Sequence, residues 1–537
     1  MFAILAGLVS LALPLGIQTI ISFVMAGSFS TSIVILIFLV VGATFITGLL
    51  QIRQMQLTEK IQQKIFVRYS LEFADRLPKM NIEKLDKYYL PELVNRFFDT
   101  VSLQKGIEKL LLDIPTAVIQ ILFGVILLSF YHPVFIGFGA ILVMLLYIIL
   151  SYTMPDGFQA SIESSNHKYE TAGWLEEMAR VIKTFKYSRG TELNIKKTDG
   201  FVKSYLDAKT HYFRILLTQY WSIVGFKVLI TAAMLIVGSI LLVDQQINIG
   251  QFIAADLVII TVISSVEKLI LNLDKVYDVM TSVEKLSKIT ESELESEGTI
   301  QLQDSPKGVS LEFNQVGFSY DGKGKQVLKN ISFSVLPGQK VCIMGESGSG
   351  KSSVLRLLTG AFHHYQGSIL IDNIPIGNFK LASLRSQTGI LLSQQDIFNG
   401  TIWENITMGN ENITHGDISD LVTKCGLDSF IQSMPMGYDT VLDPTGNKLS
   451  SKVRQDILLL RALIGKRRLL LLEQPFQHLE AAYRNQVQNF ILSDDQSTVL
   501  LATNDQQVAQ ACDLVIVLEA GGIKAQGNWK DVSNYIN

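Results

Sequence analysis

Residues that could bind phosphate lie together in the second half of the chain. An apolar run at 339–344 is followed by a glycine-rich segment and then by a helical pattern from Ser353 to Thr359. The segment consists of Gly345, Glu346, Ser347, Gly348, Ser349, Gly350, Lys351 and Ser352. Glycines let backbone N–H groups close around phosphates, Lys351 contacts the β and γ phosphates, and Ser352 is a hydroxyl ligand for Mg²⁺. This strand, loop and helix predict a P-loop for a nucleoside triphosphate, with Ser353 in the same set.

Length and composition predict a chain with one part in a membrane and one part outside it. The chain has 537 residues, whereas a single hydrophobic core stops growing at about 250–300. Hydrophobic residues make up 48% and charged residues 18%, which is too apolar for a soluble chain and too charged for a wholly embedded one. The net charge of −3 argues against nucleic acid as a partner. Three cysteines with unrelated spacing indicate no disulfide framework or metal site.

The first half contains apolar stretches of the length that a helix needs to cross a hydrocarbon core of about 30 Å. These stretches are 3–26, 33–52, 110–130, 134–153, 215–243 and 249–266. Buried helices of a large soluble protein are the alternative, but they rarely reach this length without charges. Basic residues crowd the segments from Arg53 to Lys109 and from Lys168 to Arg214, so the positive-inside rule makes both loops cytoplasmic. The sequence therefore predicts a multi-pass protein of the cell (inner) membrane.

Two charged residues lie within the predicted spans, and burying such residues in a bilayer is costly. Lys227 is expected to extend to the inner surface. Asp256 either lines a polar translocation path or makes a structural hydrogen bond to a neighbouring helix, and both alternatives stay open.

The sequence pattern changes after Glu297. Prolines and glycines then punctuate short β-like runs such as Val309 to Phe313 and Val327 to Val335. We therefore predict a transmembrane domain at 1–290, with two long cytoplasmic loops, and a nucleotide-binding domain at 300–537 in the cytoplasm.

Further segments in the second half resemble the ATP-binding cassette (ABC) ATPase domain, in the order in which that family carries them. Tyr320 precedes the P-loop where the family stacks an aromatic ring on adenine. The segment 392–406 resembles the Q-loop, whose glutamine contacts Mg²⁺ and which faces the membrane domain. Within it we choose Gln394 over Gln395 for that role.

Two more segments complete the resemblance. Leu449 and Ser450 stand where the family begins its LSGGQ signature, which binds the ATP of a partner cassette. The run 469–475 resembles the Walker B strand, in which an apolar stretch ends in acidic residues. Glu473 stands at the position of the Walker B aspartate, which orients Mg²⁺ through water. The metal set that the resemblance implies is therefore Ser352, Gln394 and Glu473.

The departures from the family pattern concern hydrolysis. Gln474 stands where the family has the glutamate that polarises the attacking water, and an amide cannot accept that proton. General-base assistance contributes about 10²–10⁴-fold to a rate, so hydrolysis should be slow while ATP binding stays intact. Asn504 occupies the place of the switch histidine that senses the γ-phosphate. Gln474 is either natural, in a degenerate cassette, or an engineered replacement of glutamate.

The signature and the D-loop also depart from the family pattern. Ser451, Lys452 and Val453 replace the Gly-Gly-Gln of the signature, so the contacts to a partner's ATP would come from Ser450, Ser451 and Lys452. The D-loop position reads Gln-His-Leu-Glu at 477–480. These departures leave the ATPase activity of the chain uncertain.

The resemblance covers almost the whole chain, including the order of its two parts, and is that of an ABC exporter half-transporter. It implies a multidomain fold, with a six-helix all-α transmembrane domain and an α/β P-loop NTPase domain, that uses ATP and Mg²⁺. The segments 13–18 and 92–99 look like those of peptide or type I secretion exporters of Bacteroidetes-type bacteria. A periplasmic membrane-fusion protein is then a further expected partner, beside the lipid bilayer.

Two functions are consistent with these features. The first is an ATP-binding half-subunit of a homo- or heterodimeric exporter that moves a peptide or protein outward. The second is a non-hydrolysing, ATP-clamped membrane regulator or scaffold. In either case, helices near Leu90 to Ser102 and Glu192 to Tyr212 are expected to rest on the ATPase domain, the latter on that of the partner.

Overall fold

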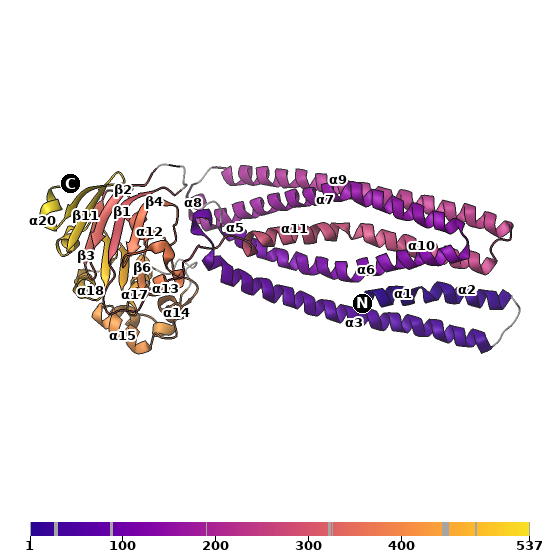
Figure 1. Ribbon diagram of the computed structural model, residues 1–537, viewed down its shortest axis with the longest axis horizontal. Helices are drawn as coiled ribbons and strands as arrows, with labels where there is room; N and C mark the ends of the chain where they lie inside the picture. The colour runs from indigo at the N-terminus through magenta and orange to yellow at the C-terminus, as the bar shows by residue number, and fades with distance from the viewer. Residues whose placement is uncertain are drawn as a thin grey trace. The chain divides into compact units, whose positions relative to one another are not determined.

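The protein divides into two compact units in a computed structural model (Figure 1). One unit comprises Met1–Met80 and Lys87–Glu293, and the other comprises Asn81–Asp86 and Leu294–Asn537. The structure describes residues 2–25, 31–85, 90–188, 191–320, 324, 326–442, 450–477, 479 and 481–535.

The first unit is helical throughout its regular structure. Its α-helices are α1 (Phe2–Ser10), α2 (Ala12–Met25), α3 (Thr31–Arg76), α5 (Leu90–Asn95), α6 (Asp99–Tyr131), α7 (Val134–Arg180), α8 (Ile182–Tyr187), α9 (Leu193–Val243), α10 (Ile249–Leu271) and α11 (Leu273–Thr290). Short 3₁₀ turns lie at Leu77–Lys79 and Arg96–Phe98. Among the described residues, six helical stretches are long and apolar enough to cross a membrane, which confirms the predicted six-helix domain.

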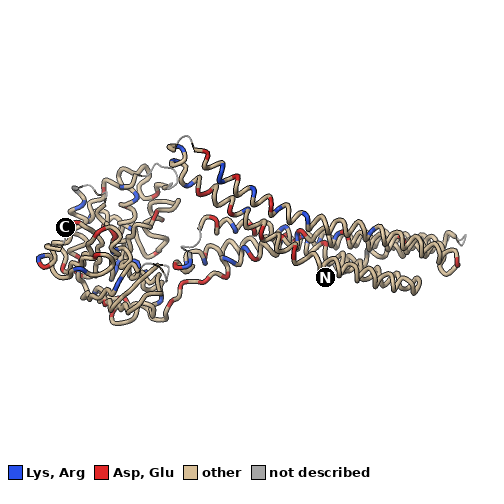
Figure 2. Tube along the Cα trace, turned by 90° about the horizontal axis from the view of Figure 1, so that it is seen from above, with Lys and Arg blue, Asp and Glu red and all other residues tan. Residues whose placement is uncertain are grey.

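The long helices extend well beyond their apolar parts. At 1.5 Å per residue, the 46 residues of α3 span about 69 Å, roughly twice the thickness of a hydrocarbon core. Figure 2 shows that charged residues occupy one half of the long helices and are scarce in the other. Glycine allows close packing in this unit, because a Cβ at Gly157 of α7 would lie 2.6 Å from the ring of Tyr277 on α11.

The charged residues within the predicted spans differ in their contacts. Lys227 on α9 forms an ion pair with Glu267 on α10, with 2.5 Å between the ammonium nitrogen and a carboxylate oxygen. The expectation for Lys227 did not include this partner, because the predicted span ended at 266. Asp256 is half-buried and forms no hydrogen bond or ion pair within the described part of the chain, and both alternatives for it stay predictions.

The second unit contains two main sheets and a two-stranded ribbon. One sheet has the strand order β2-β1-β4-β5, the other has the order β12-β11-β3-β10-β9-β6, and β7 pairs with β8. The strands are β1 (Leu311–Phe318), β2 (Leu328–Val335), β3 (Lys340–Gly345), β4 (Tyr365–Ile371), β5 (Ile374–Pro375), β6 (Thr388–Leu391), β7 (Gly400–Thr401), β8 (Val441–Leu442), β9 (Leu469–Glu473), β10 (Thr498–Ala502), β11 (Leu514–Glu519) and β12 (Gly522–Gly527).

Helices cover this α/β unit. They are α4 (Ile82–Leu85), α12 (Lys351–Leu357), α13 (Leu381–Ser386), α14 (Ile402–Thr407), α15 (His415–Lys424), α16 (Asp428–Gln432), α17 (Ser451–Leu463), α18 (Ala481–Ser493), α19 (Gln506–Gln510) and α20 (Trp529–Val532). Short 3₁₀ turns lie at Ile376–Asn378, Gly437–Asp439 and Ser533–Tyr535. The strands from β11 to β6 in the six-stranded sheet pair in parallel, and the α/β fold predicted for this half is confirmed.

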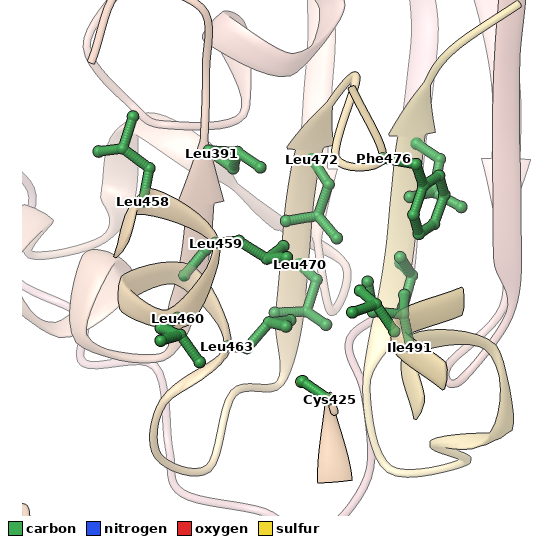
Figure 3. Close-up of a cluster of buried hydrophobic side chains, with 14 of the residues drawn as sticks. Leu391, Cys425, Leu458, Leu459, Leu460, Leu463, Leu470, Leu472, Phe476 and Ile491 are labelled. Carbon is green, nitrogen blue, oxygen red and sulfur yellow. The ribbon is translucent and has the colours of Figure 1, made fainter. Parts of the chain in front are cut away.

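The core of the second unit explains why its central strands read as continuous apolar runs. Helices cover the faces of a parallel sheet, so the side chains on both sides of β9 are buried. In Figure 3, Leu470 and Leu472 of β9 meet Leu459 and Leu463 of α17, with Ile491 of α18 beside them. This packing fixes the strand ends that carry the candidate site.

A short segment of the first long loop belongs to the second unit. Ile82 of α4 packs on the core of that unit, and Glu83 accepts hydrogen bonds from the amides of His363 at 2.7 Å and His364 at 3.1 Å. Residues 81–86 were not singled out from the sequence, which predicts a helix on the ATPase domain near Leu90 to Ser102. Residues 90–102 lie in the helical unit, and their contact with the ATPase domain stays a prediction.

Candidate nucleotide site

The glycine-rich loop connects the end of β3 to the start of α12. Gly345 has a φ of +141° and Gly350 a φ of +105°, values that residues with a side chain rarely adopt. A Cβ at Gly345 would also lie 2.2 Å from the carbonyl oxygen of Leu518. Glu346, Ser347 and Gly348 are exposed on the loop, whereas Ser349 and Gly350 are buried at its base. The backbone thus forms the tight turn expected of a phosphate-binding loop.

Lys351 stands at the first position of α12 and turns back over the loop. Its ammonium group donates hydrogen bonds to the carbonyl oxygens of Gly345 at 2.6 Å and Glu346 at 2.8 Å. Burial lowers the pKa of Lys351 from its ordinary value, and the nearby Glu473 carboxylate partly opposes this shift. A cation therefore lies against the loop, where a phosphate would be neutralised.

Ser352 and Glu473 meet at the carboxyl end of β9. One carboxylate oxygen of Glu473 accepts the hydroxyl of Ser352 at 2.5 Å, and the other accepts the backbone N–H of Ser393 at 2.9 Å. Hydroxyl and carboxylate oxygens are the ligands that Mg²⁺ prefers, together with phosphates and water. Among the described residues, no group of three His, Cys, Asp or Glu side chains could hold a metal without such help. The residues present therefore fit Mg²⁺ bound with a nucleotide.

Gln474 and Asn504 lie at the ends of neighbouring strands. Gln474 follows β9 with a φ of +47°, and its N–H donates to the carbonyl oxygen of Ala502 on β10 at 2.9 Å. The Asn504 side-chain oxygen accepts the N–H of Gly345 at 3.1 Å. Both side chains are exposed beside the P-loop. The fold thus brings the predicted base and switch positions to one edge of the sheet, and both carry neutral amides.

The glutamine chosen from the Q-loop lies on the turn after β6. Gln394 is exposed there, whereas the Gln395 side-chain oxygen accepts the N–H of Leu392 at 3.2 Å. The Gln395 side chain therefore stabilises its own turn, whereas the Gln394 side chain is exposed. The role of Gln394 at the metal stays a prediction. Sequence reasoning did not anticipate that the Ser393 amide contacts Glu473 directly, because a backbone group leaves no mark in residue types.

Tyr320 is half-buried in an aromatic cluster with Phe318 and Phe362. Its hydroxyl lies 3.0 Å from the Ser353 hydroxyl and accepts a hydrogen bond from Arg356 at 3.0 Å. The ring is thereby joined to α12 and so to the P-loop. Arg356 was not singled out from the sequence. Because it follows Ser352 by four residues on a helix, the two share one face, and this spacing could have indicated that Arg356 lies near the site.

The signature residues lie apart from the P-loop of their own chain. Ser450 caps α17, accepting the N–H of Val453 at 3.2 Å, and Ser451 is the first residue of that helix. The Lys452 ammonium lies 5.5 Å from the ring centre of Tyr483 on α18. Helix α17 packs on edge strand β6, which is three strands from β3 in the sheet. Leu449, His478 and Glu480 lie outside the described residues.

Comparisons with known proteins agree with this arrangement. The family model "ABC transporter transmembrane region" matches residues 1–266, and the model "ABC transporter" matches residues 328–477. The solved structure "Structure of a bacterial Atm1-family ABC exporter with ATP bound" matches with a TM-score of 0.89 at 18% identity, over 100% of this chain and 95% of that chain. At this identity, the likeness shows the fold alone.

Two curated relatives have different roles. The "Transport/processing ATP-binding protein ComA" of Streptococcus pneumoniae is 26% identical over 449 residues, which are 82% of this chain and 62% of that protein. The "ATP-dependent lipid A-core flippase" of Haemophilus influenzae is 32% identical over 254 residues, which are 47% of this chain and 43% of that protein. The chain thus spans less than two thirds of either relative.

Proposed function

The chain belongs to the ABC transporter family, as a multi-pass transmembrane region fused to an ATP-binding cassette, and we propose that it is one half of a dimeric exporter with impaired ATP hydrolysis. The observation that carries this proposal is Gln474. It directly follows Glu473, the last residue of β9, whose carboxylate accepts the hydroxyl of Ser352, so Gln474 stands where a general base is needed. The amide leaves ATP binding possible and removes the proton acceptor.

Dimerisation follows from the separation of the two nucleotide-binding surfaces. The P-loop, Glu473 and Asn504 gather at the ends of the central strands, whereas Ser450, Ser451 and Lys452 begin a helix on the edge strand. A second cassette, of this chain or of a related one, would supply its signature to complete each site. ATP would be held by the P-loop backbone, Lys351 and Tyr320, and Mg²⁺ by Ser352, Glu473 and Gln394.

The substrate that we propose is a peptide or protein, moved out across the cytoplasmic membrane, with a periplasmic membrane-fusion protein as a further partner. Support comes from the resemblance of segments 13–18 and 92–99 to exporters of this kind and from the similarity to ComA, whose name describes transport and processing. The similarity to a lipid A-core flippase supports lipid as the competing substrate class.

A second candidate is a regulator or scaffold that uses ATP only as a clamp. It is favoured by the number of departures, since Gln474, Asn504, Ser451 and Lys452 all differ from the family pattern. Lys452 contributes most to this alternative. It places a bulky cation where the signature has a glycine, and its ammonium lies over the ring of Tyr483.

The experiment that separates the two functions is the steady-state ATPase rate of Gln474→Glu. If the missing base is the main deficiency, the carboxylate should raise the rate by about 10²-fold or more over the unaltered chain. Adding Lys351→Ala to Gln474→Glu is the control, since it should remove the gain. A rate that stays flat would favour the scaffold, and brisk ATPase by the unaltered purified chain would refute the role given to Gln474.

A further inference from the structure

A groove of about 710 Å³ lies in the cassette at the opposite end of the strands from the P-loop. Its lining includes the last residues of α17 and α18 and the loops that lead into β9 and β10. Strand β9 begins beside the groove at Leu469 and ends at Glu473 in the nucleotide site. The volume is that of a site for a small organic molecule, typically about 300–1,000 Å³. None of the residues assigned to ATP or Mg²⁺ lines it.

Cationic side chains outnumber acidic ones in the lining. Lys424, Lys466, Arg467 and Arg468 line the groove, against Asp304 and Asp494. Arg468 is already engaged, because it donates to Asp372 at 2.8 Å and to three backbone carbonyl oxygens. The Asp494 carboxylate accepts the Ser497 hydroxyl at 2.6 Å and the Gln496 N–H at 3.0 Å. Among the described residues, Lys424, Lys466 and Arg467 form no ion pair, so the lining keeps an excess of positive charge.

Arg467 has the strongest requirement for such a partner. One terminal nitrogen of its guanidinium donates to the carbonyl oxygen of Ser386, but its Nε is buried without a hydrogen-bond partner in the described structure. A buried donor without a hydrogen-bond partner is unfavourable, and more so when the group is charged. Burial also lowers the pKa of Arg467 from its ordinary value. An anion beside the groove-facing part of the guanidinium would favour its charged form and so offset the effect of burial.

The exposed lysines alone have a simpler explanation. Lys424 is the last residue of α15 and Lys466 follows the end of α17, so both cations lie near helix carboxyl ends, where positive charge is favourable. That effect does not account for Arg467, whose unpaired N–H is shielded from water. The inference therefore rests on Arg467 and on the apolar side of the groove.

The apolar side of the groove is formed by Leu463, Leu470 and Phe490, together with Pro306. Leu463 and Leu470 extend from the core where α17 meets β9, as Figure 3 shows. We propose that this groove binds a small organic oxyanion, such as a phosphate ester, with its anionic group at Arg467 and Lys466 and its apolar part on Leu463 and Phe490. A site of this kind is separate from the one that holds ATP.

The test uses phenyl phosphate as a probe on the full chain in nanodiscs, with the nucleotide site filled by saturating Mg·ADP. Saturation-transfer NMR of the phenyl protons gives its Kd, and competition gives that of inorganic phosphate. Because the ring adds apolar contact, phenyl phosphate should bind about tenfold more tightly than phosphate. Lys351→Ala without nucleotide should bind the probe equally well, which separates this groove from the ATP site.

Two variants test the assigned residues. Arg467→Gln and the exposed Lys466→Gln should each raise the Kd of phenyl phosphate about tenfold, while Lys329→Gln on strand β2, which does not line the groove, should leave the Kd unchanged. Lys466→Gln guards against a folding defect at the half-buried Arg467. Equal Kd values in all variants, or no saturable binding below about 10 mM, would overturn the proposal. Displacement of the probe by a poly-glutamate peptide at lower concentration would assign the groove to an acidic protein segment.

Discussion

At the scale of single residues, the Lys351 ammonium both holds the backbone of the P-loop and places a positive charge beside it. Its ammonium donates to the carbonyl oxygens of Gly345 and Glu346, and a hydrogen bond from a charged group contributes a net of about 1.5–3 kcal/mol. A phosphate bound in the loop would compete for the same donor. The lysine therefore serves both the shape of the free loop and the binding of phosphate.

We predict that Lys351→Ala abolishes the thermal stabilisation that ATP gives to the cassette. A ligand of the folded state stabilises by RT ln(1 + [L]/Kd), so losing the cation that neutralises the phosphates should remove the ATP-dependent rise in melting temperature. The melting temperature without ATP should fall by the loss of the two hydrogen bonds that Lys351 makes to the loop, so the quantity compared is the rise that ATP produces in each variant. Differential scanning fluorimetry measures both, with Lys329→Ala as the matched exposed cation. An unaltered ATP-dependent shift in Lys351→Ala would sink the assignment.

The sequence predicted most of these residues, but not their contacts. The order of strand, glycines, lysine and serine identified the P-loop because backbone conformation constrains residue type at each of those positions. The left-handed backbone at Gln474 was not predictable, since glutamine has no preference for a φ of +47°. Nor was the Ser393 N–H that holds Glu473, because any residue except proline supplies that donor.

At the scale of elements, the segment α4 shows how a short loop helix is tied to the cassette. Burial of Glu83 alone would raise its pKa, but hydrogen bonds from the His364 side chain and from the amides of His364 and His363 bring the pKa below its ordinary value. Its two amide contacts use one carboxylate oxygen. Without these hydrogen-bond donors the Glu83 carboxylate would not be stabilised in its charged form. The lowered pKa of Glu83 therefore depends on the packing of α4 on the cassette.

The docked state of α4 should therefore depend on pH. A lowered pKa means that Glu83 contributes stability above its unfolded value near 4.3, and that this contribution is lost as pH falls through the lowered folded pKa. Glu83→Ala should make hydrogen exchange at the His363 and His364 amides faster at pH 7. The difference from the unaltered chain should vanish in acid, after correction for intrinsic rates. Glu297→Ala is an exposed control, and unchanged protection in Glu83→Ala would contradict the contact.

Helix α17 carries the signature at one end and core residues along its length. Leu459 is fully buried against the sheet, so Leu459→Ala should lose about 2–5 kcal/mol and lower the melting temperature of the cassette. Leu336→Ala removes the same atoms from a side chain that is 65% exposed and should change stability by less than about 0.5 kcal/mol. The two variants are compared by thermal unfolding. Equal melting temperatures would show that α17 is not packed as described.

The helical elements were easier to predict than the position of docking. Twenty apolar residues in a row require a spanning helix, because backbone groups in lipid must bond internally. The docking segment instead depends on which loop residues meet the cassette surface, and Glu83 with His363 is a pair 280 residues apart. The groove at the end of the strands opposite the P-loop could not be predicted for the same reason, since its lining comes from separate stretches between Asp304 and Ser497.

At the scale of the whole molecule, one chain holds both halves of a nucleotide site without joining them. Its P-loop lies on the central strands and its signature begins α17, so two chains are needed for one closed site under the proposed function. In a homodimer, both sites would combine Gln474 and Asn504 with the altered signature. With a standard partner, one site would lack the base and the other would contain Ser451 and Lys452, so neither would be wholly normal.

Such a homodimer should retain ATP. Without a general base, hydrolysis is slowed by about 10²–10⁴-fold, so ATP should stay between closed cassettes and keep two chains together. Purified chain incubated with Mg²⁺ and radiolabelled ATP is passed through size exclusion, and the label in the dimer fraction is followed over time. The label should remain as ATP in the unaltered chain, should be lost with Lys351→Ala, and should be converted to ADP and released about 10²-fold faster with Gln474→Glu. If the dimer released ATP simply by opening, the rate of release would not depend on residue 474. Equally fast loss of intact ATP from the unaltered chain and from Gln474→Glu would therefore contradict a dimer whose opening is limited by hydrolysis.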